Sequence, residues 1–532
     1  MTPGKNDRRD FLRVAGAGIA SGAVQISPAA AQTSPVAPGG AIHDIKLFGA
    51  TGDGKSIDTP AVNRAIEAAS AAGGGTVRFP AGSYLCYSIR LKSNVSLYLD
   101  QNAVIIAADS PSSGSGGYDA AEPNTPWNDY QDYGHNHWHN SLLWGEGLKN
   151  VSIFGPGLIW GRGLSRGYGP GPIAENPGVA NKAISLKNCR NVILRDFSIL
   201  KGGHFGVLAT GVDNVTVDNL KIDTDRDGID LDCCRNVRVS NCTVNSPWDD
   251  AICPKSSFAL GYARATENVT ITNCYVTGMY QLGTLLDGTF KPHDSTYKGD
   301  RTGRVKFGTE SNGGFRNITI SNCVFEGCQG LALETVDGAL LEDIAITNIT
   351  MRDITSAPIF LRLGARMRGP QRVPVGALRR VLISNIVCSN SDSRFGSIIS
   401  GIPGHAIEDI KISDVYIQHQ GGETSETAAL EPADLEKSYP EPKMFGKMPS
   451  QGFFIRHVKN IEMSHVEISS LQADARPAFV LDDVQGARFF RIRGPHADGV
   501  PRFVLNNVED FDVYLSQPVP DTQITQVESK KL

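Results

Sequence analysis

The segment from Ile222 to Lys255 concentrates carboxylates at a spacing that could do chemistry. Five aspartates fall in its first eleven residues, and a second acidic pair, Asp249-Asp250, follows after one strand-like run. Alternate side chains of an extended chain share a face, so Asp223, Asp225 and Asp227 are predicted to project together. Such a group of carboxylates beside a second pair serves either as a cation site or as a set of acids and bases.

A short repeated phrase runs along most of the chain and must position these carboxylates. It reads Asn or Asp, Val or Ile, any residue, then Ile or Val, and copies at 191–194, 214–217 and 236–239 are 23 and 22 residues apart. Short alternating strands at this period, with Asn and Gly at the corners, are typical of an all-β, right-handed parallel β-helix. Its coils stack ~4.8 Å apart and share one core.

Two other features complete the predicted architecture. Apolar residues at helical spacing over 59–72, after a plausible N-cap at Asp58, predict one short helix that covers the open N-terminal end of the stack. Insertions between coils are predicted to line one side and to build a binding groove, because loops on a rigid scaffold carry function. These insertions are 107–140, 278–303, 364–376 and 420–450.

The first forty residues have the composition of a targeting segment. Arg8-Arg9, a short Gly/Ala-rich apolar run and a small-residue site near Ala31 predict a signal peptide over 1–31, similar to bacterial twin-arginine signals. A Pro/Gly-rich linker is predicted over 32–40 and a single β-helix catalytic domain over 41–532. The expected location is the periplasm or the medium, and no membrane span is expected because no other apolar run approaches about 18 residues.

Charge and cysteine content narrow the class of protein. The net charge is −5, and removal of the signal, which carries +2, leaves about −7, which argues against a nucleic-acid partner. Four of the ten cysteines directly follow Asn (Cys189, Cys242, Cys274 and Cys323), which indicates one recurring, buried coil position. Buried thiols are favoured over disulfides, no zinc spacing is present, and we expect a monomer without a cofactor.

Two motifs in the acidic segment resemble those of family 28 glycoside hydrolases, the polygalacturonase family. Asp227-Gly228, within Asp227-Gly228-Ile229-Asp230, is similar to the Asp-Gly of the family's Asn-Thr-Asp-Gly, although Asp225-Arg226 replace Asn-Thr. Trp248 to Ser256 is similar to its Gly-Asp-Asp-Cys-Ile-Ala-Ile-Lys-Ser one coil later. Segments 48–54 and 79–82 resemble the N-terminal cap of the pectin lyase-like superfamily. Over about 42–420, the resemblance implies a divergent, inverting glycosidase that acts on a pectin-related, acidic glycan.

The resemblance also implies roles for the catalytic carboxylates. Asp250 would be the general acid, and Asp227 and Asp249 would activate water. Inverting hydrolysis commonly uses carboxyl groups ~6.5–9.5 Å apart, a separation that we expect between adjacent coils. Neighbouring side chains of a regular strand point to opposite faces, so both members of the Asp249-Asp250 pair can face one groove only across a bend, which we predict at Pro247-Trp248.

Two further motifs of the family are not matched in the expected register. Gly303 stands where a His is expected, and Ala332 and Glu334 stand where an Arg and a Lys are expected. Glu310 and Glu334 are candidate replacements, with two surface carboxylates as the alternative. A nearby Arg304-Val305-Lys306 resembles the family's Arg-Ile-Lys, although its downstream context fits the motif less well.

Five other residues are predicted to bind substrate. Lys255 could orient the carboxylates or contact the glycan, and Asp225 and His204 flank the first motif, His204 with a structural hydrogen-bonding role as its alternative. Arg362 and Arg366, placed in an inserted loop, could grip a sugar carboxylate, with a solvated basic face as the alternative.

Competing functions remain open at this stage. A calcium-dependent polysaccharide lyase on the same fold would use Asp223, Asp225 and Asp227 to bind the ion, with an Arg as base. A non-catalytic β-helix, such as an adhesin or a carbohydrate-binding module, would explain the repeats alone. The alternating histidines His135, His137 and His139 could bind a metal, but a sugar-stacking wall or an ordered loop is favoured, and no metal is assigned.

Overall fold

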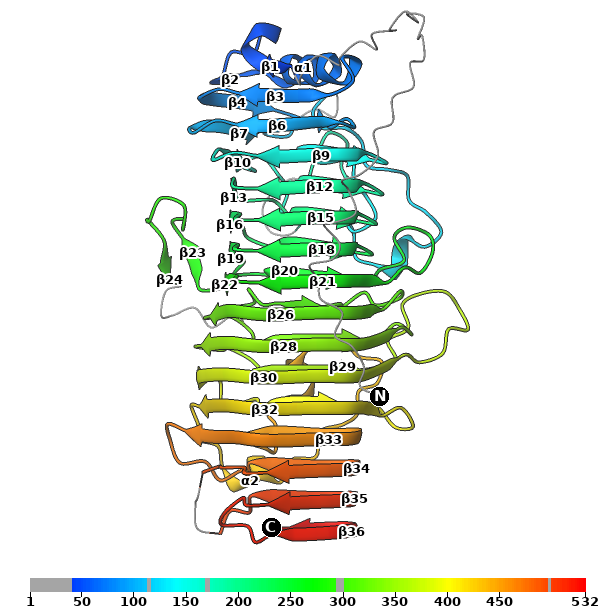
Figure 1. Ribbon diagram of the computed structural model, residues 1–532, viewed down its shortest axis with the longest axis vertical. Coiled ribbons are helices and arrows are strands. Elements are labelled where there is room, and N and C mark those ends of the chain that lie inside the picture. The colour runs from blue at the N-terminus through cyan, green and yellow to red at the C-terminus, as the bar shows by residue number, and fades with distance from the viewer. Residues whose placement is uncertain (1–40, 112–115, 168–172, 293–300, 496–498) are drawn as a thin grey trace, which may run out of the picture. The chain divides into compact units, whose positions relative to one another are not determined.

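The computed structural model describes residues 41–111, 116–167, 173–292, 301–495 and 499–532. Residues 41–532 form one compact unit, in which successive coils of parallel strands stack on one another (Figure 1). The predicted right-handed parallel β-helix is therefore confirmed. The predicted signal peptide (1–31) and linker (32–40) lie outside the described residues. No helix in the described part of the chain is long and apolar enough to cross a membrane.

Each coil of the N-terminal half contributes one strand to each of three faces. The first face contains β3 (Gly75–Phe79), β6 (Val95–Leu99), β9 (Lys149–Phe154), β12 (Arg190–Arg195), β15 (Asp213–Asp218), β18 (Arg235–Ser240) and β21 (Thr266–Thr272). The second contains β4 (Gly82–Cys86), β7 (Ala103–Ala107), β10 (Leu158–Trp160), β13 (Ser198–Leu200), β16 (Lys221–Asp223), β19 (Thr243–Asn245) and β22 (Tyr275–Thr277). The third contains β5 (Ile89–Arg90), β8 (Leu143–Glu146), β11 (Lys182–Lys187), β14 (Phe205–Thr210), β17 (Asp227–Asp232) and β20 (Ile252–Lys255).

In the C-terminal half, long strands cover the first two faces without a break. They are β26 (Phe315–Glu326), β28 (Leu340–Arg352), β30 (Ala377–Ser391), β32 (Ile407–His419), β33 (Phe453–Ser470), β34 (Phe479–Phe490) and β35 (Phe503–Tyr514). The third face continues through β25 (Lys306–Phe307), β27 (Leu331–Thr335), β29 (Ile359–Leu363) and β31 (Ser397–Ser400) into the start of β33. This third face carries the candidate site.

A different element finishes each end of the stack. The short β1 (Ile42–Asp44), the 3-10 turn η2 (Ile45–Phe48) and β2 (Asp53–Ile57) precede the predicted capping helix α1 (Thr59–Ala71), which buries the apolar side of its surface on the first coil. The carboxylate of Asp58 does not cap this helix; it accepts hydrogen bonds from the backbone N–H groups of Thr51 and Gly52 instead. At the C-terminal end, β36 (Thr522–Lys531) pairs antiparallel with β35 and covers the edge that would otherwise stay unpaired.

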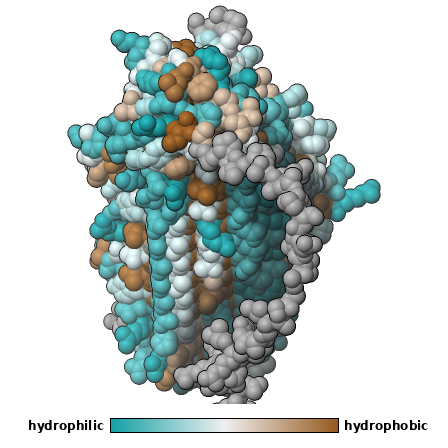
Figure 2. Space-filling model, turned by 45° about the horizontal axis from the view of Figure 1, so that its top comes forward, coloured by the Kyte–Doolittle hydropathy of each residue, from teal (hydrophilic) through white to brown (hydrophobic). Residues whose placement is uncertain are grey.

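The repeated Asn of the sequence phrase has a structural explanation. Asn150, Asn191 and Asn214 all adopt a left-handed backbone conformation, with φ of 58°, 56° and 57°, which Asn tolerates better than most residues. Their side-chain amides form a ladder, in which Asn214 donates to Asn191 at 2.7 Å and Asn191 donates to Asn150 at 2.9 Å. Side chains of like hydropathy accordingly form continuous columns along the stack (Figure 2).

The interior is apolar, and it contains all of the cysteines. The ten cysteines are free, buried thiols, as predicted. The recurring position after Asn is confirmed, because the Sγ atoms of Cys242, Cys274 and Cys323 each donate to the carbonyl of the residue two positions earlier, at 3.2 Å. Burial raises the pKa of the Cys86 and Cys234 thiols, so the thiols of the core are held protonated.

The insertions leave the stack as loops, as predicted. The hairpin of β23 (Tyr280–Leu282) and β24 (Lys291–Pro292) projects beside β22 (Figure 1). The loop before β8 holds the 3-10 turn η3 (Asn128–Tyr130), and the loop before β33 holds α2 (Ser425–Ala428) and the 3-10 turn η4 (Pro442–Phe445). The loop before β33, residues 420–452, is called the 420–452 loop below.

Candidate active site

The three aspartates predicted to be catalytic meet on the third face. Asp227 begins β17, and Asp249 and Asp250 follow a turn at Pro247-Trp248, where the bend was predicted, just before β20. One carboxylate oxygen of each of the three residues lies within 4.8 Å of the others. The backbone N–H of Asp250 also donates to Oδ1 of Asp227 at 3.3 Å.

This separation is shorter than the ~6.5–9.5 Å predicted for an acid and base on adjacent coils. The prediction assumed carboxylates offset along their strands. Instead, residue 250 lies directly beside the start of β17, where the N–H of Gly228 donates to the carbonyl of Asp250 at 3.0 Å. The three carboxyl groups therefore form one tight cluster.

The members of this cluster differ in their preferred protonation. Burial raises the pKa of Asp227 well above its ordinary value, and the neighbouring Asp230 and Asp249 raise it further. Burial would also raise the pKa of Asp249, but Arg226 outweighs it and holds that pKa well below its ordinary value. Arg226 binds Oδ2 of Asp249 through Nε at 3.0 Å and Nη2 at 2.6 Å. The surroundings thus favour the protonated form of Asp227 and the ionised form of Asp249.

Lys255 lies at the centre of a second buried group beside this cluster. Its Nζ is 3.7 Å from Asp230 and 3.6 Å from Glu310, and His135 is 3.8 Å from the same Asp230 carboxylate. Burial raises the pKa of Asp230, whereas Lys255 holds the pKa of Glu310 below its ordinary value despite burial. The structure therefore brings two predicted binding residues, Lys255 and Glu310, to the site.

The predicted alignment of Asp223, Asp225 and Asp227 on one face is wrong. The strand β16 ends at Asp223 and β17 begins at Asp227, so the chain turns between them and the alternation of a single strand does not apply. Asp223 accepts from the side chain of Asn245 at 2.8 Å, and Asp225 pairs with Arg166 at 3.2 Å. The three carboxylates that the calcium hypothesis required thus lie apart, and each contacts different residues of the protein.

Arg304 and Lys306 are site residues that the sequence reasoning placed outside the site. Arg304 Nε donates to Oδ1 of Asp250 at 2.8 Å, and Lys306 Nζ lies 3.8 Å from Oδ2 of the same carboxylate. Both cations are buried, with side chains 2% and 3% exposed. The Arg-Val-Lys triplet was visible as a signal, but β25 follows β20 directly, with Ile252 paired to Val305, so the triplet lies one coil earlier than the expected register.

Glu441 and Tyr439, in the 420–452 loop, also reach the site. Glu441 Oε1 accepts from Arg304 at 2.5 Å and from Lys306 at 3.3 Å, and Lys306 Nζ lies 5.2 Å from the centre of the Tyr439 ring. Arg304 and Glu441 are 137 residues apart in sequence. No pattern in the chain predicts such a contact, so the sequence reasoning missed it.

Glu334 is buried beside the same cations, and the surface alternative for it and for Glu310 is wrong. Both side chains are at most 2% exposed. Neither oxygen of Glu334 has a hydrogen-bond partner among the described residues, and Lys306 Nζ is 3.7 Å away. Burial raises the pKa of Glu334 to about 8, against the opposing effect of Lys306. Glu334 thus stands where a family lysine is expected, while a lysine, Lys306, lies beside it on the preceding coil.

The two arginines predicted to grip a sugar carboxylate are held by the protein itself. Arg362 lies on β29, not in an inserted loop, and it donates to Ser400 and to the backbone carbonyls of Gly401, Asp434 and Leu435. Arg366 follows β29 and binds Asp337 through two hydrogen bonds. The solvated basic face is wrong for Arg362, whose side chain is buried.

The histidines do not converge on one point. His204 stacks on Phe205, with ring centres 4.2 Å apart, and burial next to Arg226 holds its pKa well below its ordinary value. His135 lies near Asp230, whereas His137 contacts Asn124 and His139 contacts Glu146. The alternating histidines therefore belong to an ordered loop with separate partners.

Three groups among the described residues have ligand atoms close enough together to hold a metal ion. They are Asp227/Asp249/Asp250, His135/Asp227/Asp230 and Glu122/His139/Glu146. The first two lie in the site and share Asp227. In the third, Glu146 already pairs with Lys187 at 2.9 Å.

Family models match two parts of the chain. The model described as rhamnogalacturonase A/epimerase, pectate lyase-like, matches residues 42–196, and the right-handed β-helix region model matches residues 173–299. A probable polygalacturonase of Vitis vinifera is 23% identical over 323 residues, which cover 57% of this chain and 60% of that protein. The mannuronan C5-epimerase AlgE3 of Azotobacter vinelandii is 48% identical over 65 residues, 12% of this chain and 4% of that protein.

A solved structure shows the same fold. The family 28 exopolygalacturonase of Yersinia enterocolitica superposes with a TM-score of 0.60 at 18% identity, covering 90% of this chain and 79% of that chain. Together, these matches confirm the resemblance found in the sequence. The chain is similar to polygalacturonase-type and pectate lyase-like proteins, and it shares the β-helix fold of the solved exopolygalacturonase.

Proposed function

We propose that the protein is an exported, inverting glycoside hydrolase of polygalacturonase type that cleaves a pectin-related glycan. The observation that carries this proposal is the cluster of Asp227, Asp249 and Asp250, whose oxygens lie within 4.8 Å while burial and Arg226 shift the pKa values of two members in opposite directions. Carboxyl groups with divergent pKa values are the arrangement that acid–base catalysis at one site requires. The similarity to the grape polygalacturonase supports the class of substrate.

The pKa directions assign the roles within the cluster. Asp227 retains its proton and donates it to the leaving oxygen, and ionised Asp249 takes a proton from the attacking water. Asp250, bound to Arg304, orients the other two through its backbone N–H. This assignment differs from the one implied by the family resemblance, which gives the acid role to Asp250, because burial favours the protonated form of Asp227.

Water is favoured over an enzyme carboxylate as the attacking group. Asp227 is protonated, Asp249 is bound by two N–H groups of Arg226, and Asp250 is bound by Arg304. A protonated or ion-paired carboxyl group is a weak nucleophile, so Asp227 and Asp250 are poorly suited to form a glycosyl-enzyme bond, and we assign Asp249 as the base that activates water. Attack by water breaks the glycosidic bond with inversion at the anomeric carbon.

Turnover of pectic glycans by the purified protein tests the proposal. Wild type and Asp249→Asn are compared with and without EDTA, and products are followed by reducing ends, by ultraviolet absorbance of unsaturated sugars and by NMR of the first-formed anomer. New reducing ends without unsaturation, inverted, insensitive to EDTA and lost in the variant, support the hydrolase. Unsaturated, EDTA-sensitive products support the lyase, and absence of turnover across the panel supports the non-catalytic alternative.

A second experiment separates the acid from the base. An aryl glycoside with a good leaving group needs little protonation, so we expect Asp227→Asn to keep far more activity on it than on a natural glycan. Azide can replace the attacking water, so we expect it to restore activity to Asp249→Asn but not to Asp227→Asn. If the aryl substrate rescues Asp250→Asn instead of Asp227→Asn, Asp250 is the acid, as the resemblance implies.

Export is part of the proposal and rests on residues 1–31. A core without disulfides can form before translocation, as the twin-arginine route requires. Sequencing of the N-terminus of protein recovered from the periplasm or medium is expected to begin at Gln32. Replacement of Arg8-Arg9 by two lysines is expected to leave the protein inside the cell, and unchanged export of that variant would remove the twin-arginine route.

A further inference from the structure

The carboxylate of Glu441 occupies the cationic pair beside the candidate site. It accepts from Arg304 at 2.5 Å and from Lys306 at 3.3 Å, while Arg304 also binds Asp250. The Glu441 side chain is only 13% exposed. Burial favours its neutral form, but the two cations outweigh burial and lower its pKa to about 2, so Glu441 is ionised. An anion supplied by the protein thus fills the position where these cations could bind the anion of a substrate.

The other cations around the cluster also have carboxylate partners in the protein. Arg226 binds Asp249 at 2.6 Å, and Arg366 binds Asp337 at 2.5 Å. Lys255 lies between Asp230 and Glu310, at 3.7 and 3.6 Å. Each of these cations is therefore balanced by an acid of the protein, and a substrate carboxylate would have to compete with that acid for it.

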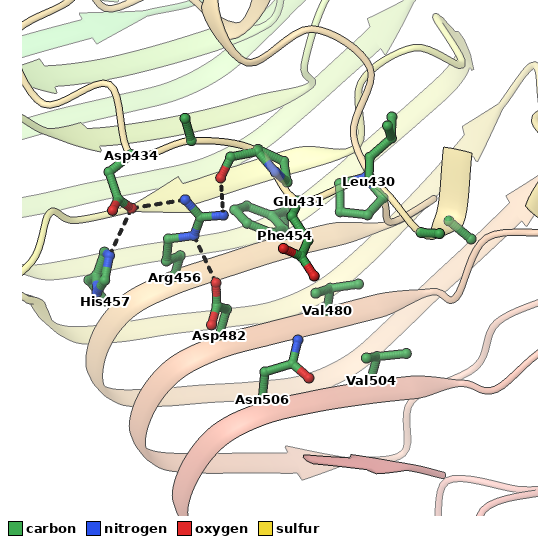
Figure 3. Close-up of a pocket in the computed structure, with 15 residues that line it drawn as sticks. Leu430, Glu431, Asp434, Phe454, Arg456, His457, Val480, Asp482, Val504 and Asn506 are labelled. Carbon is green, nitrogen blue, oxygen red and sulfur yellow. Dashed lines mark hydrogen bonds and ion pairs between the residues drawn. The ribbon is translucent and has the colours of Figure 1, made fainter. Parts of the chain in front are cut away.

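The loop that carries Glu441 is firmly attached to the third face. Figure 3 shows Arg456 of β33 reaching Asp434 of the loop and Asp482 of β34. Arg456 also donates to the backbone carbonyl of Pro432 in the loop. Arg362 of β29 donates to two further loop carbonyls. On the side of Glu441 that leads to β33, Phe445 and Met448 pack into an apolar cluster with the face. Glu441 is thus held on both sides in sequence, and its departure would break buried contacts.

We infer that Glu441 stands in for a substrate carboxylate, so that the sugar unit bound next to Asp250 is a neutral pyranose rather than a uronate. The inference rests on the proposed function and narrows it, because a pectin-related glycan can contain neutral as well as acidic units. A uronate at this position would place its carboxylate against Glu441 in a site with little water, where like charges repel strongly. Glu441 is therefore a specificity-determining residue.

The test uses pairs of substrates that differ only at the carboxyl group. Oligosaccharides of homogalacturonan and rhamnogalacturonan are compared with their carboxyl-reduced, neutral forms, by calorimetric binding and by turnover. We expect the wild-type protein to prefer the neutral member of a pair at least tenfold in Kd and in kcat/KM. We expect Glu441→Gln to improve binding and turnover of the acidic member, relative to the neutral member, about tenfold.

Two further variants control for general effects of the substitution. Glu431→Gln removes an exposed carboxylate from the same loop, in the wall of the cavity of about 590 Å³ shown in Figure 3, and is expected to leave the preference unchanged. Glu441→Asp keeps the charge and is expected to keep the neutral preference. Thermal unfolding of each variant shows whether the fold is intact, and the wild-type comparison needs no substitution.

The possible outcomes separate this inference from the proposed function. Preference of the wild-type protein for the acidic member, an unchanged ratio in Glu441→Gln, or failure of both members to bind overturns the role of Glu441. Binding without turnover, in which the preference still reverses in Glu441→Gln, removes the proposed hydrolysis and supports the inference. Turnover of acidic members alone supports the hydrolase and removes the inference.

Discussion

Two arginines on the third face, Arg304 and Arg456, each bridge two carboxylates, and their surroundings differ. Arg304 joins Asp250 to Glu441, with side chains 2%, 4% and 13% exposed. Arg456 is equally buried, but its partners Asp434 and Asp482 are 34% and 36% exposed. The same chemical unit is therefore enclosed at the candidate site and open to water in the cavity of Figure 3.

The enclosed region also holds more acids than its cations can pair. Asp227, Asp230 and Glu334 lie there, and burial raises the pKa of each. Around Arg456, the pKa of Asp434 is instead lowered by His457 and Arg456, which outweigh its partial burial. The comparison teaches that the arginine bridge alone does not mark a functional site. The surplus of buried carboxyl groups is what marks the candidate site, because their raised pKa values keep protons available at neutral pH.

The largest expected effect is on turnover. Asp249→Asn removes the proposed base and is expected to lower kcat about 10³-fold, within the range for loss of a general acid or base. The matched change at the open bridge, Asp482→Asn, is expected to alter kcat less than about twofold. Release of reducing ends measures both. Equal losses in the two variants would break the distinction between the two regions.

The next effect concerns stability against pH. Folded Glu334 binds its proton more tightly than the unfolded chain does, since its pKa rises from 4.5 to about 8. Its contribution to stability is fully present below pH 4.5 and is lost as pH rises to about 8, at up to about 1.4 kcal/mol per pH unit. Urea unfolding at pH 4.5, 6 and 8 is expected to show this loss in wild type and in Asp482→Asn, but a smaller one in Glu334→Gln. A loss of the same size in Glu334→Gln would exclude this residue as its source.

The third effect separates structural from functional use of the bridge. Arg456→Met is expected to lower the free energy of unfolding by about 2–3 kcal/mol, because hydrogen bonds to charged partners are lost. Its kcat is expected to stay within about threefold of wild type, whereas Arg304→Met is expected to lose on the order of 100-fold. Denaturant titration and steady-state kinetics on the same preparations test this. A large kinetic defect in Arg456→Met would extend the functional region to the cavity of Figure 3.

The smallest expected effect is on the free energy of unfolding, at a coil position outside both regions. Asn214→Ala loses a ladder hydrogen bond and places Ala at φ 57°, so we expect a loss of about 1–2 kcal/mol in the free energy of unfolding. Asn214→Gly loses the same hydrogen bond but relieves the left-handed strain, and is expected to lose less. A larger loss in the Gly variant would mean that the amide ladder, not the backbone conformation, explains the repeated Asn.

Much of the fold could be predicted from the sequence because a coil is a local unit. The 22- and 23-residue spacing of Asn191, Asn214 and Asn236 reports a turn and an amide ladder that recur at each coil. The bend before Asp249 was predictable for a similar reason, since neighbouring residues must share one face. Where the prediction assumed a regular strand through a corner, as for Asp223 to Asp227, it was wrong.

The candidate site could be predicted only in part, because about half of its residues come from segments that are distant in sequence from the acidic motifs. Asp227 and Asp249 could be predicted from their residue type and their one-coil spacing. Arg304 and Lys306 were misplaced because an insertion hides how many coils separate them from β20. Glu441 lies in a loop whose path depends on contacts with Arg362 and Arg456. Such contacts leave no periodic signal in the sequence.

The link between Arg304 and Glu441 has a consequence for how the molecule unfolds. In a stacked repeat each coil touches only its neighbours, so the two ends can fray independently. This link instead ties residues 137 positions apart and makes the candidate site depend on the coils that anchor the loop. Melting of the C-terminal coils would release Glu441 and so change the surroundings of Arg304 and Asp250 on the earlier coils. The link therefore couples the folding of the C-terminal coils to the arrangement of the residues in the candidate site.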